Sequence, residues 1–99
     1  MKSVLKYKLD IDTCLSFGNV LEIPKNSKIL DIQYQDKNIV MWCLVDLQFE
    51  HEKVKRVFEI YGTGDIVAEK NYKYLKTLQS ETSYIVGSGL VWHIFEKIK

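Results

Sequence analysis

The sequence has no hydrophobic run that approaches the ~20 residues of a membrane-spanning helix. Residues 1–12 alternate charged and apolar side chains, unlike the hydrophobic stretch of a secretory signal peptide. The sequence also lacks internal repeats, linkers and low-complexity segments, and a chain of 99 residues rarely divides into two cores. We therefore expect one soluble, intracellular domain over residues 1–99, with no membrane partner.

An excess of charge of either sign is missing as well. The 14 basic and 13 acidic residues leave a net charge of +1, whereas proteins that bind duplex DNA usually carry a clear basic excess. This balance argues against a duplex nucleic acid partner. It does not argue against a small anionic ligand, which needs only two or three well-placed donors. Apolar residues at 46% indicate a folded domain rather than a disordered chain.

Cysteine and histidine are scarce. Cys14 and Cys43 lack metal-type spacing, and Cys43 lies in an apolar run, so we expect free thiols in a reducing compartment. His51 and His93 are far apart, and no local Cys/His/Asp/Glu cluster accompanies them, which predicts no metal site. No serine has a nucleophile-elbow setting and no catalytic set assembles. We expect a protein that is not an enzyme and has no cofactor.

Alternating apolar and polar residues predict a mainly β fold. After a turn at 25–27, Leu30, Ile32 and Tyr34 alternate with polar residues, so these three side chains should share one face of a strand. Residues 39–49 are apolar on both faces, as in a central strand covered on both sides. The other expected strands are 3–11, 57–61, 76–86 and 90–98, with a hairpin turn at 36–38 and a charged turn at 50–56.

One segment is compatible with a helix. Residues 65–75, DIVAEKNYKYL, are polar, and Asp65 is available as N-cap. The predicted fold class is thus α+β, mainly β: a small antiparallel sheet of five to six strands with one short helix. Because so small a chain buries only roughly two-thirds of its unfolded surface, we expect a homo-oligomer with any ligand in a groove between subunits.

Gly62, Thr63 and Gly64 separate a predicted strand from this predicted helix. Glycines permit positive φ and close approach of a ligand to the backbone, and amides at a helix N-terminus attract anions. The spacing matches neither a P-loop nor a dinucleotide fingerprint. Taken alone, these residues favour a structural turn over a phosphate-binding site.

Aromatic residues with polar tips are numerous. Such rings stack on nucleobases, contributing roughly 1–3 kcal/mol per base, or they fill the core. We expect Trp42 to lie in the core, because its strand is apolar on both faces. In the last strand, Trp92 and Ile94 share one face while His93 and Phe95 share the other; one face should be core and the other open to a ligand or partner. The tyrosines and tryptophans considered are Tyr7, Tyr34, Trp42, Tyr61, Tyr72, Tyr74, Tyr84 and Trp92.

Polar candidates are fewer. His93 could act as a base, a hydrogen-bond donor or a satisfied half-buried histidine, and the last is favoured. Arg56 lies a few residues before the glycine turn, and a guanidinium can bind a phosphate with two parallel hydrogen bonds. A solvated charge on a strand face is an equal alternative for Arg56 and the favoured one for Lys6, Lys8 and Lys28.

Five segments, taken in order, resemble a widespread family of small phage and prophage proteins. They are KYKLDI, EIPKNSKILDIQYQ, MWCLVD, FEIYGTGDI and GLVWHIFE. The family pattern reads K-Y-x-L, P-K-G-A-x-I-L-S-V-Q-x-Q, L-W-A-L-V-D, F-G-T-G and L-V-W-H-V-F-E, and the similarity spans nearly the whole chain. Three departures are Asn26-Ser27 in place of Gly-Ala, Cys43 in place of alanine, and a longer loop between Leu78 and Leu90. The longer loop would alter any ligand preference that it carries.

Members of this family resemble anti-CBASS sponges, viral proteins that hold the cyclic nucleotide messengers of bacterial immunity without cleaving them. The resemblance implies a phage-encoded protein of the host cytoplasm that sequesters a cyclic dinucleotide such as 3′3′-cGAMP. It also raises phosphate contact at the glycine turn to an equal alternative with a plain turn. The implied site consists of stacking rings from Tyr7, Trp42, Tyr61 or Trp92, a phosphate contact at Gly62, Thr63 and Gly64, charge from Arg56 or Lys8, and a hydrogen bond from His93.

A small phage adaptor or inhibitor that binds a host protein through an exposed strand edge is the alternative. The aromatic residues would then anchor the protein–protein interface. A phosphodiesterase lacks the residues that cleavage would need.

Overall fold

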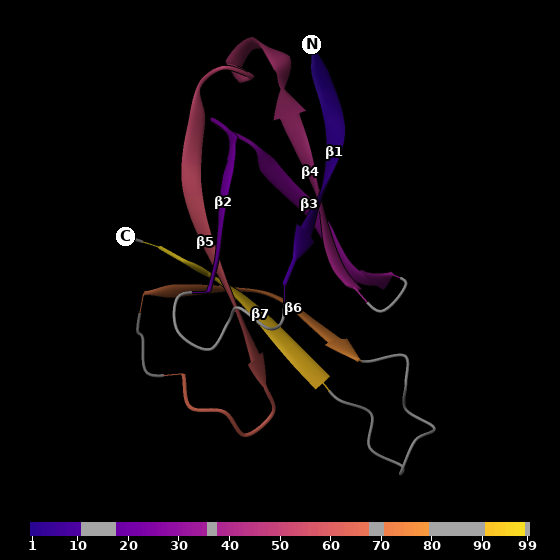
Figure 1. Ribbon diagram of the computed structural model, residues 1–99, viewed down its shortest axis with the longest axis vertical. Coiled ribbons are helices and arrows are strands. Elements are labelled where there is room, and N and C mark those ends of the chain that lie inside the picture. The colour runs from indigo at the N-terminus through magenta and orange to yellow at the C-terminus, as the bar shows by residue number, and fades with distance from the viewer. Residues whose placement is uncertain (11–17, 36–37, 68–70, 80–90, 99) are drawn as a thin grey trace.

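The computed structural model describes residues 1–10, 18–35, 38–67, 71–79 and 91–98 (Figure 1). Over these ranges the chain is almost entirely strand, and the one helical element is a short 3-10 turn. The elements are β1 (Lys2–Leu9), β2 (Asn19–Pro24), β3 (Lys28–Gln35), β4 (Asn38–Asp46), η1 (Leu47–Phe49), β5 (Lys53–Gly62), β6 (Tyr72–Gln79) and β7 (Val91–Lys97). The prediction of a mainly β, antiparallel fold is confirmed. None of the described helical structure is long and apolar enough to span a membrane.

The strands form two antiparallel sheets, where the sequence predicted one. The first sheet has the order β1-β4-β3, and the second has the order β2-β5-β7-β6. β4 is the centre of its sheet, as its apolar sequence predicted. β5 is long enough to serve two partners, because Lys53–Phe58 pair with β2 while Phe58–Gly62 pair with β7. Figure 1 shows β5 running nearly the height of the molecule.

The core lies between the inner faces of the two sheets. It contains Phe58, Ile60 and Ile94 of the second sheet and Met41 and Ile39 of the first, and all five are at most 3% exposed. Together with the other core residues they form one continuous cluster. The core is thin, as expected for the length, because each sheet contributes only one face to it.

Cys43 belongs to this core as a free, buried thiol. Burial raises the pKa of its thiol, since the interior disfavours the thiolate. The expectation of a free thiol is confirmed for Cys43, and Cys14 lies outside the described residues.

The predicted helix over residues 65–75 is wrong where the structure describes that range. Asp65–Val67 are irregular and Tyr72–Leu75 belong to β6. The Asp65 carboxylate accepts a hydrogen bond from the Gly62 amide, which closes the turn instead of capping a helix. Tyr72, Lys73 and Tyr74 of the YKYL segment pair with β7 at the edge of a sheet, and tyrosine favours strands. Sheet pairing therefore overrides the modest helix preference of the segment.

A β-bulge in β3 explains a second difference between the predicted and the observed strands. The register of β3 shifts between Ile29 and Asp31, so Leu30 is an extra residue and is 47% exposed, while Ile29 packs against the core. The prediction that Leu30 shares a face with Ile32 and Tyr34 is wrong because the bulge interrupts the alternation. A similar bulge interrupts β6 between Tyr74 and Lys76.

β2 and the first part of β5 were not predicted from the sequence. β2 is short and ends at Pro24, yet its Asn19, Leu21 and Ile23 point inward while Val20 and Glu22 point outward. The charged residues Lys53–Arg56, taken as a turn, extend β5 because they pair with β2. Their exposed lysines fit a strand whose outer face meets solvent.

A partly buried ion pair joins the second sheet to the turn between β2 and β3. Arg56 donates from Nε and Nη2 to the two carboxylate oxygens of Glu96, at 2.6 and 2.8 Å, and from Nη1 to the Ser27 carbonyl at 2.8 Å. The Arg56 and Glu96 side chains are only 22% and 12% exposed. The hydrogen bonds to Glu96 raise the pKa of Arg56 further above its usual value, so the guanidinium stays charged.

We expect the substitution Arg56→Met to lower the free energy of unfolding by about 3 kcal/mol. It leaves the Glu96 carboxylate without its cation in a site that water reaches poorly. The double substitution Arg56→Met with Glu96→Leu should recover much of this loss, since it removes both charges. Urea unfolding followed by tryptophan fluorescence measures both effects. A loss below about 1 kcal/mol for the single variant would instead identify a solvated surface pair.

Candidate functional site

Four aromatic rings lie together on the outward face of the second sheet. The register places Phe95 of β7 opposite Glu59 of β5 and Tyr74 of β6, while Tyr61 lies opposite His93. These side chains alternate with the core residues of the same strands, so they point away from the core. We call Tyr61, Tyr72, Tyr74 and Phe95 the aromatic face.

Phe95 is the centre of this group. Its ring centroid lies 5.8 Å from that of Tyr61, 6.0 Å from that of Tyr72 and 5.7 Å from that of Tyr74. The Tyr61 and Tyr74 rings meet Phe95 edge-on, at 77° and 69°. Tyr74 is 54% exposed, the most open tyrosine of the group. Edge-on packing holds the rings in place and leaves surface on which a flat ligand can stack.

A carboxylate fixes two of these rings. The hydroxyl groups of Tyr61 and Tyr72 both donate to Oε2 of Glu59, the first at 2.6 Å, and the two hydroxyl oxygens lie 3.2 Å apart. The carboxylate thus orients both tyrosines from the middle of the face. It also places an acceptor beside the rings, where it could meet the amino groups of a base.

His93 lies next to the rings and is held from both sides. Its Nε2 lies 2.9 Å from Oγ1 of Thr63, and its Nδ1 lies 3.1 Å from Oγ1 of Thr77. The Thr77 hydroxyl also lies 2.7 Å from that of Tyr74. A threonine hydroxyl can donate or accept, so the pair satisfies either tautomer of the imidazole. This network connects the glycine turn to the aromatic face.

The glycine turn closes on itself. The Asp65 amide donates to the Gly62 carbonyl at 3.1 Å, and the Gly62 amide donates to Oδ2 of Asp65 at 2.7 Å. One of the amides expected to hold a phosphate is thus used by a carboxylate within the turn. Gly64 has φ of 96° and no atom within 4 Å of the position that a Cβ would occupy, so its surroundings are open. The turn positions Thr63 beside His93.

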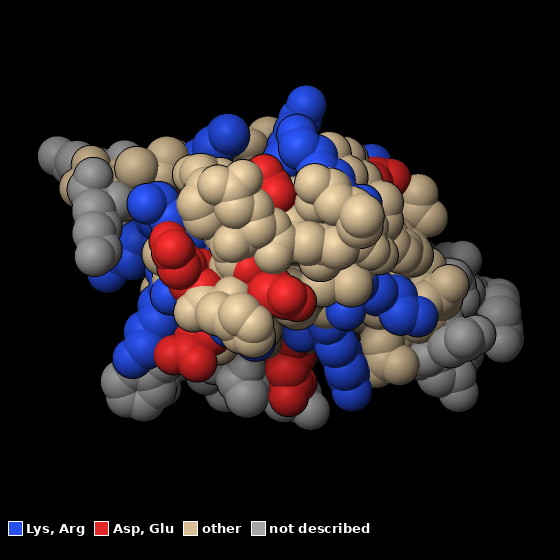
Figure 2. Space-filling model, turned by 90° about the horizontal axis from the view of Figure 1, so that it is seen from above, with Lys and Arg blue, Asp and Glu red and all other residues tan. Residues whose placement is uncertain are grey.

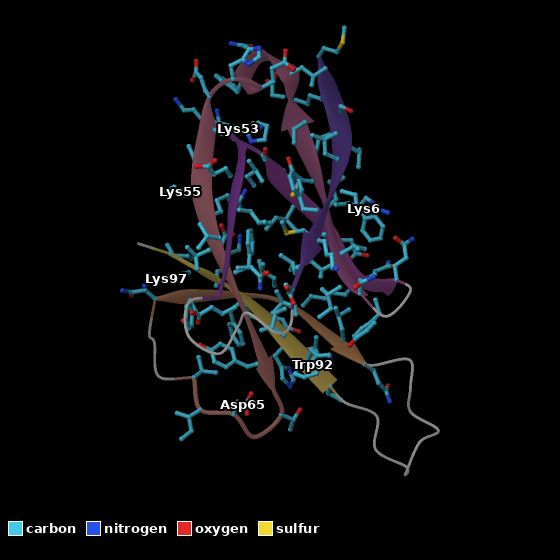
Figure 3. The ribbon with its side chains drawn as sticks, viewed as in Figure 1. Lys6, Lys53, Lys55, Asp65, Trp92 and Lys97 are labelled. Carbon is cyan, nitrogen blue, oxygen red and sulfur yellow. The ribbon has the colours of Figure 1, made fainter. Side chains whose placement is uncertain are left out.

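The predicted site residues divide between the two sheets. Tyr61, Thr63 and His93, with the two flanking glycines, gather at one end of the aromatic face, at the end of β5 and the start of β7. Figure 3 shows Trp92 and Asp65 at this same end of the molecule. Trp92 lies on the opposite face of β7, packs against the core and donates from Nε1 to the Tyr34 hydroxyl at 3.0 Å.

The remaining predicted residues lie elsewhere. Tyr7, Lys8 and Trp42 belong to the first sheet. Tyr7 packs against the core, and burial raises its pKa. Trp42 was expected in the core but points outward and is partly buried, because only one face of β4 packs against the second sheet. Arg56 is bound to Glu96 and Ser27, so most of its capacity to meet a phosphate is already used.

Sequence reasoning missed Tyr72, Tyr74 and Phe95 as members of one site. The alternation of the last strand did predict that Phe95 shares a face with His93. That face points outward, because Ile94, between them in the sequence, is fully buried on the other face. Tyr72 and Tyr74 were assigned to a helix, which removed the period-two alternation that places them beside Phe95. No group of three or more His, Cys, Asp or Glu side chains within the described ranges is placed to hold a metal ion.

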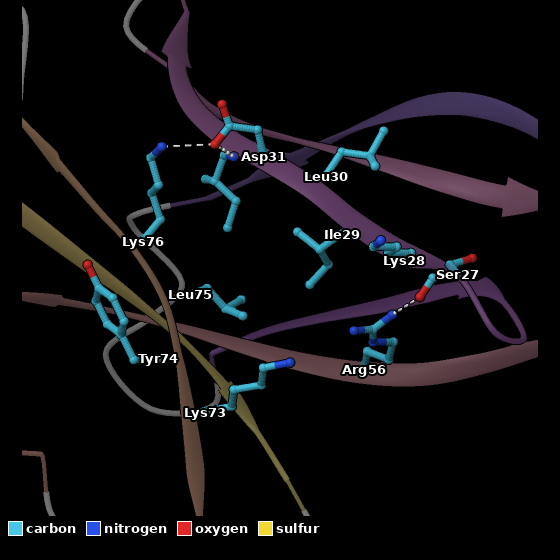
Figure 4. A pocket seen from close by; sticks show the side chains of 11 residues that line it. Ser27, Lys28, Ile29, Leu30, Asp31, Arg56, Lys73, Tyr74, Leu75 and Lys76 are labelled. Atoms are coloured by element: carbon cyan, nitrogen blue, oxygen red, sulfur yellow. Dashed lines mark hydrogen bonds and ion pairs between the residues drawn. The ribbon is translucent and has the colours of Figure 1, made fainter.

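A second feature is a cleft between the facing edges of the two sheets, of about 460 Å³. β3 and β6 form its two sides, and Arg56 lies at one end (Figure 4). Figure 4 shows Ile29 and Leu75 directed toward one another in the middle of the cleft. The other end is closed by Lys76, whose Nζ lies 2.9 Å from Oδ1 of Asp31. We call this the basic cleft, because its side chains include Lys28, Arg56, Lys73 and Lys76.

The geometry defines a class of protein: a small, mainly β domain of two antiparallel sheets, one of which carries an aromatic outer face. The chain belongs to the family described as a domain of unknown function, DUF7352, whose profile matches residues 1–99. No curated protein matches the chain, and no solved structure matches it. The family description assigns no activity.

The Asp31–Lys76 ion pair should make stability depend on acidity. The pKa of Asp31 is lowered below the usual 3.8, chiefly because its carboxylate accepts a hydrogen bond from Lys76. Hydrogen bonds from Gln33 and from the Ile32 amide lower the pKa further. A lowered pKa in the folded state means that the contribution is fully present above the unfolded-state pKa and is lost as the pH falls through the folded-state pKa.

We therefore expect Asp31→Asn to lower the free energy of unfolding slightly at pH 7, and this difference from the native protein to shrink and then vanish as the pH falls from the unfolded-state pKa through the lowered folded-state pKa of Asp31. Urea unfolding at a series of pH values between about 7 and 2 measures the difference. Glu22→Gln, a change at another exposed carboxylate, is the control. A difference that stays constant down to the lowest pH would contradict the assignment.

Proposed function

We propose that this protein binds a cyclic dinucleotide, without cleaving it, on the aromatic face. The observation that carries the proposal is the grouping of four aromatic rings with His93 on the outward side of one sheet. Aromatic side chains on an open sheet face are a recurrent way to stack unpaired nucleobases. The mainly β fold and the position of the rings support this use over a purely structural one, because core residues lie on the other side of the same strands.

Each part of the face has a role in this proposal. Tyr74, the most exposed ring, offers a stacking surface beside Phe95. The Glu59 carboxylate can accept from the amino or imino group of a purine, such as the guanine of 3′3′-cGAMP. His93 and Thr63 can bond to a base edge or to a phosphate at the end of β5.

Positive charge for the phosphodiester groups lies at the other end of the face. Lys97 is opposite Tyr72 in the register of β6 and β7. Figure 3 shows Lys97 and Lys55 on the same side of the molecule, away from Trp92. In the view of Figure 2 basic and acidic side chains are interspersed, without a broad face of one sign. Such a surface suits a small anionic ligand better than a duplex.

Sequestration requires tight binding, and a nanomolar dissociation constant corresponds to about −12 kcal/mol. A single flat face supplies less than this, so we propose that the protein acts as a homo-oligomer, a dimer or tetramer, that covers the ligand from two sides. Trp42 and Lys8 point outward from the first sheet. They would reach a ligand on the aromatic face only from a second copy of the chain.

The similarity of the sequence to small phage proteins supports a role as an anti-CBASS sponge in the host cytoplasm. The alternative role is an adaptor that pairs a strand of a host protein with an exposed sheet edge. The edge strands β3 and β6 are poorly suited to such pairing. Both carry a bulge and lysine side chains, which disfavour strand addition.

A thermal-shift panel tests the proposal against cyclic di- and trinucleotides, with linear dinucleotides as controls. At a ligand concentration 100 times the dissociation constant, binding adds about 2.7 kcal/mol of stability. For a domain of this size we expect the Tm to rise by about 10 °C or more. The ligand recovered after denaturation should be chemically intact. No shift with any cyclic nucleotide, together with capture of a host protein, would support the adaptor instead.

Variants locate the site. Tyr74→Leu should weaken binding roughly 5- to 150-fold, as expected for the loss of one stacking ring, and His93→Ala should weaken it as well. Phe49→Leu removes a ring from η1, outside the aromatic face, and should leave affinity unchanged. Equal losses in all three variants would place the ligand elsewhere or indicate a general effect on folding.

A further inference from the structure

We propose that the basic cleft is a second binding site, which takes an oligophosphate group. Tyr74 of the aromatic face also lines the cleft, but Figure 4 shows its ring directed away from Lys73 and Arg56, the charged side chains at the other end. The volume of the cleft, about 460 Å³, lies within the range of small-ligand sites. The inference goes beyond the proposed function and does not depend on it.

The positive charges of the cleft exceed what its own carboxylates neutralise. Lys76 is paired with Asp31, and Arg56 is paired with Glu96. Lys28 and Lys73 form no ion pair with any described residue, and both line the cleft. In Figure 4 the ammonium group of Lys73 is directed across the cleft toward Arg56. Two unneutralised ammonium groups beside a guanidinium favour a ligand that carries several negative charges.

Arg56 retains some capacity for such a ligand. A guanidinium has five N–H groups, and the bonds to Glu96 and Ser27 use one from each of its three nitrogens. The other two N–H groups belong to Nη1 and Nη2. Because Glu96 and Ser27 fix the guanidinium in place, an anion would meet a donor that is already oriented.

The positive region continues beyond the cleft. A neighbouring hollow of about 610 Å³ shares Arg56 and Lys73 with it and adds Lys55 and Lys97, so this hollow borders the end of the aromatic face at Lys97, opposite Tyr72. These two lysines are likewise outside any ion pair with the residues that the structure describes. A chain of phosphate groups, with charge spread along its length, matches a row of separated lysines better than a single carboxylate does.

The backbone keeps the cleft open. β3 and β6 are the free edges of their sheets, and two facing edges could join through a continuous ladder of hydrogen bonds. Each has a bulge at the cleft, and the extra residues are Leu30 and Leu75. A bulge disrupts the ladder and bends the strand, so the two edges remain apart at this point. The two bulges lie on opposite sides of the cleft, so both edges are irregular where the cleft is.

Isothermal titration calorimetry with inorganic tripolyphosphate tests the proposal, with sodium sulfate at equal ionic strength as the control anion. We expect saturable binding of tripolyphosphate and none of sulfate. Lys73→Gln should weaken binding about tenfold or more, and Lys28→Gln should weaken it too. Lys53→Gln makes the same change of charge on β5 outside both hollows and should leave affinity unchanged. Comparison of ATP with tripolyphosphate shows whether a nucleoside adds affinity.

Two results would overturn the proposal. One is the absence of saturable binding to the native protein; the other is an equal loss in Lys73→Gln and Lys53→Gln, which would indicate attraction by net charge alone. His93→Ala, which alters the aromatic face, should bind tripolyphosphate normally. Failure of the cyclic dinucleotide proposal is thereby distinguishable from failure of this one, and the Tm of each variant confirms that it is folded.

Discussion

The ion pair between Arg56 and Glu96 is the interaction on which the rest of the arrangement depends. It lies on the core side of β5 and β7, and its third hydrogen bond reaches the Ser27 carbonyl in the turn that leads into β3. It thus fixes the second sheet against the beginning of an edge strand of the first. Charged groups this little exposed are costly to bury and tolerated only when well paired. Arg56 also lines the cleft, so the same pair fixes one end of it.

The division of aromatic side chains between faces has the largest functional consequence. In a domain of this length only one face of each sheet is buried against the other sheet, so some of the aromatic side chains lie outside the core. Phe58 and Trp92 serve the core, whereas Tyr61, Tyr72, Tyr74 and Phe95 lie on the outward face of the same sheet. These rings are held by one another and by a carboxylate, yet lie outside the core, and they form the surface that we propose as the binding site.

Much of the fold could be predicted from alternation alone, since β1, β4 and β7 follow from period-two patterns and apolar runs. The rest depended on information that is not local. The bulge at Leu30 interrupts the pattern of β3, and β6, whose sequence was compatible with a helix, pairs with β7 instead. For the site, Tyr61, Thr63 and His93 could be named from the glycine turn and the last strand. Arg56 and Trp92 could not be assigned, because their partners Glu96 and Tyr34 lie 40 and 58 residues away in the sequence.

We propose that the aromatic face, and not Trp92 or the outer face of the first sheet, meets a nucleotide. An NMR titration of the aromatic and indole signals with 3′3′-cGAMP distinguishes these surfaces. We expect progressive shifts of the Tyr74, Phe95 and His93 ring signals, with the indole signal of Trp92 nearly unchanged because its N–H is bound to the Tyr34 hydroxyl. Unchanged signals on the aromatic face while the Trp42 indole shifts, or no shift at all at high ligand concentration, would show that the aromatic face is not the binding site.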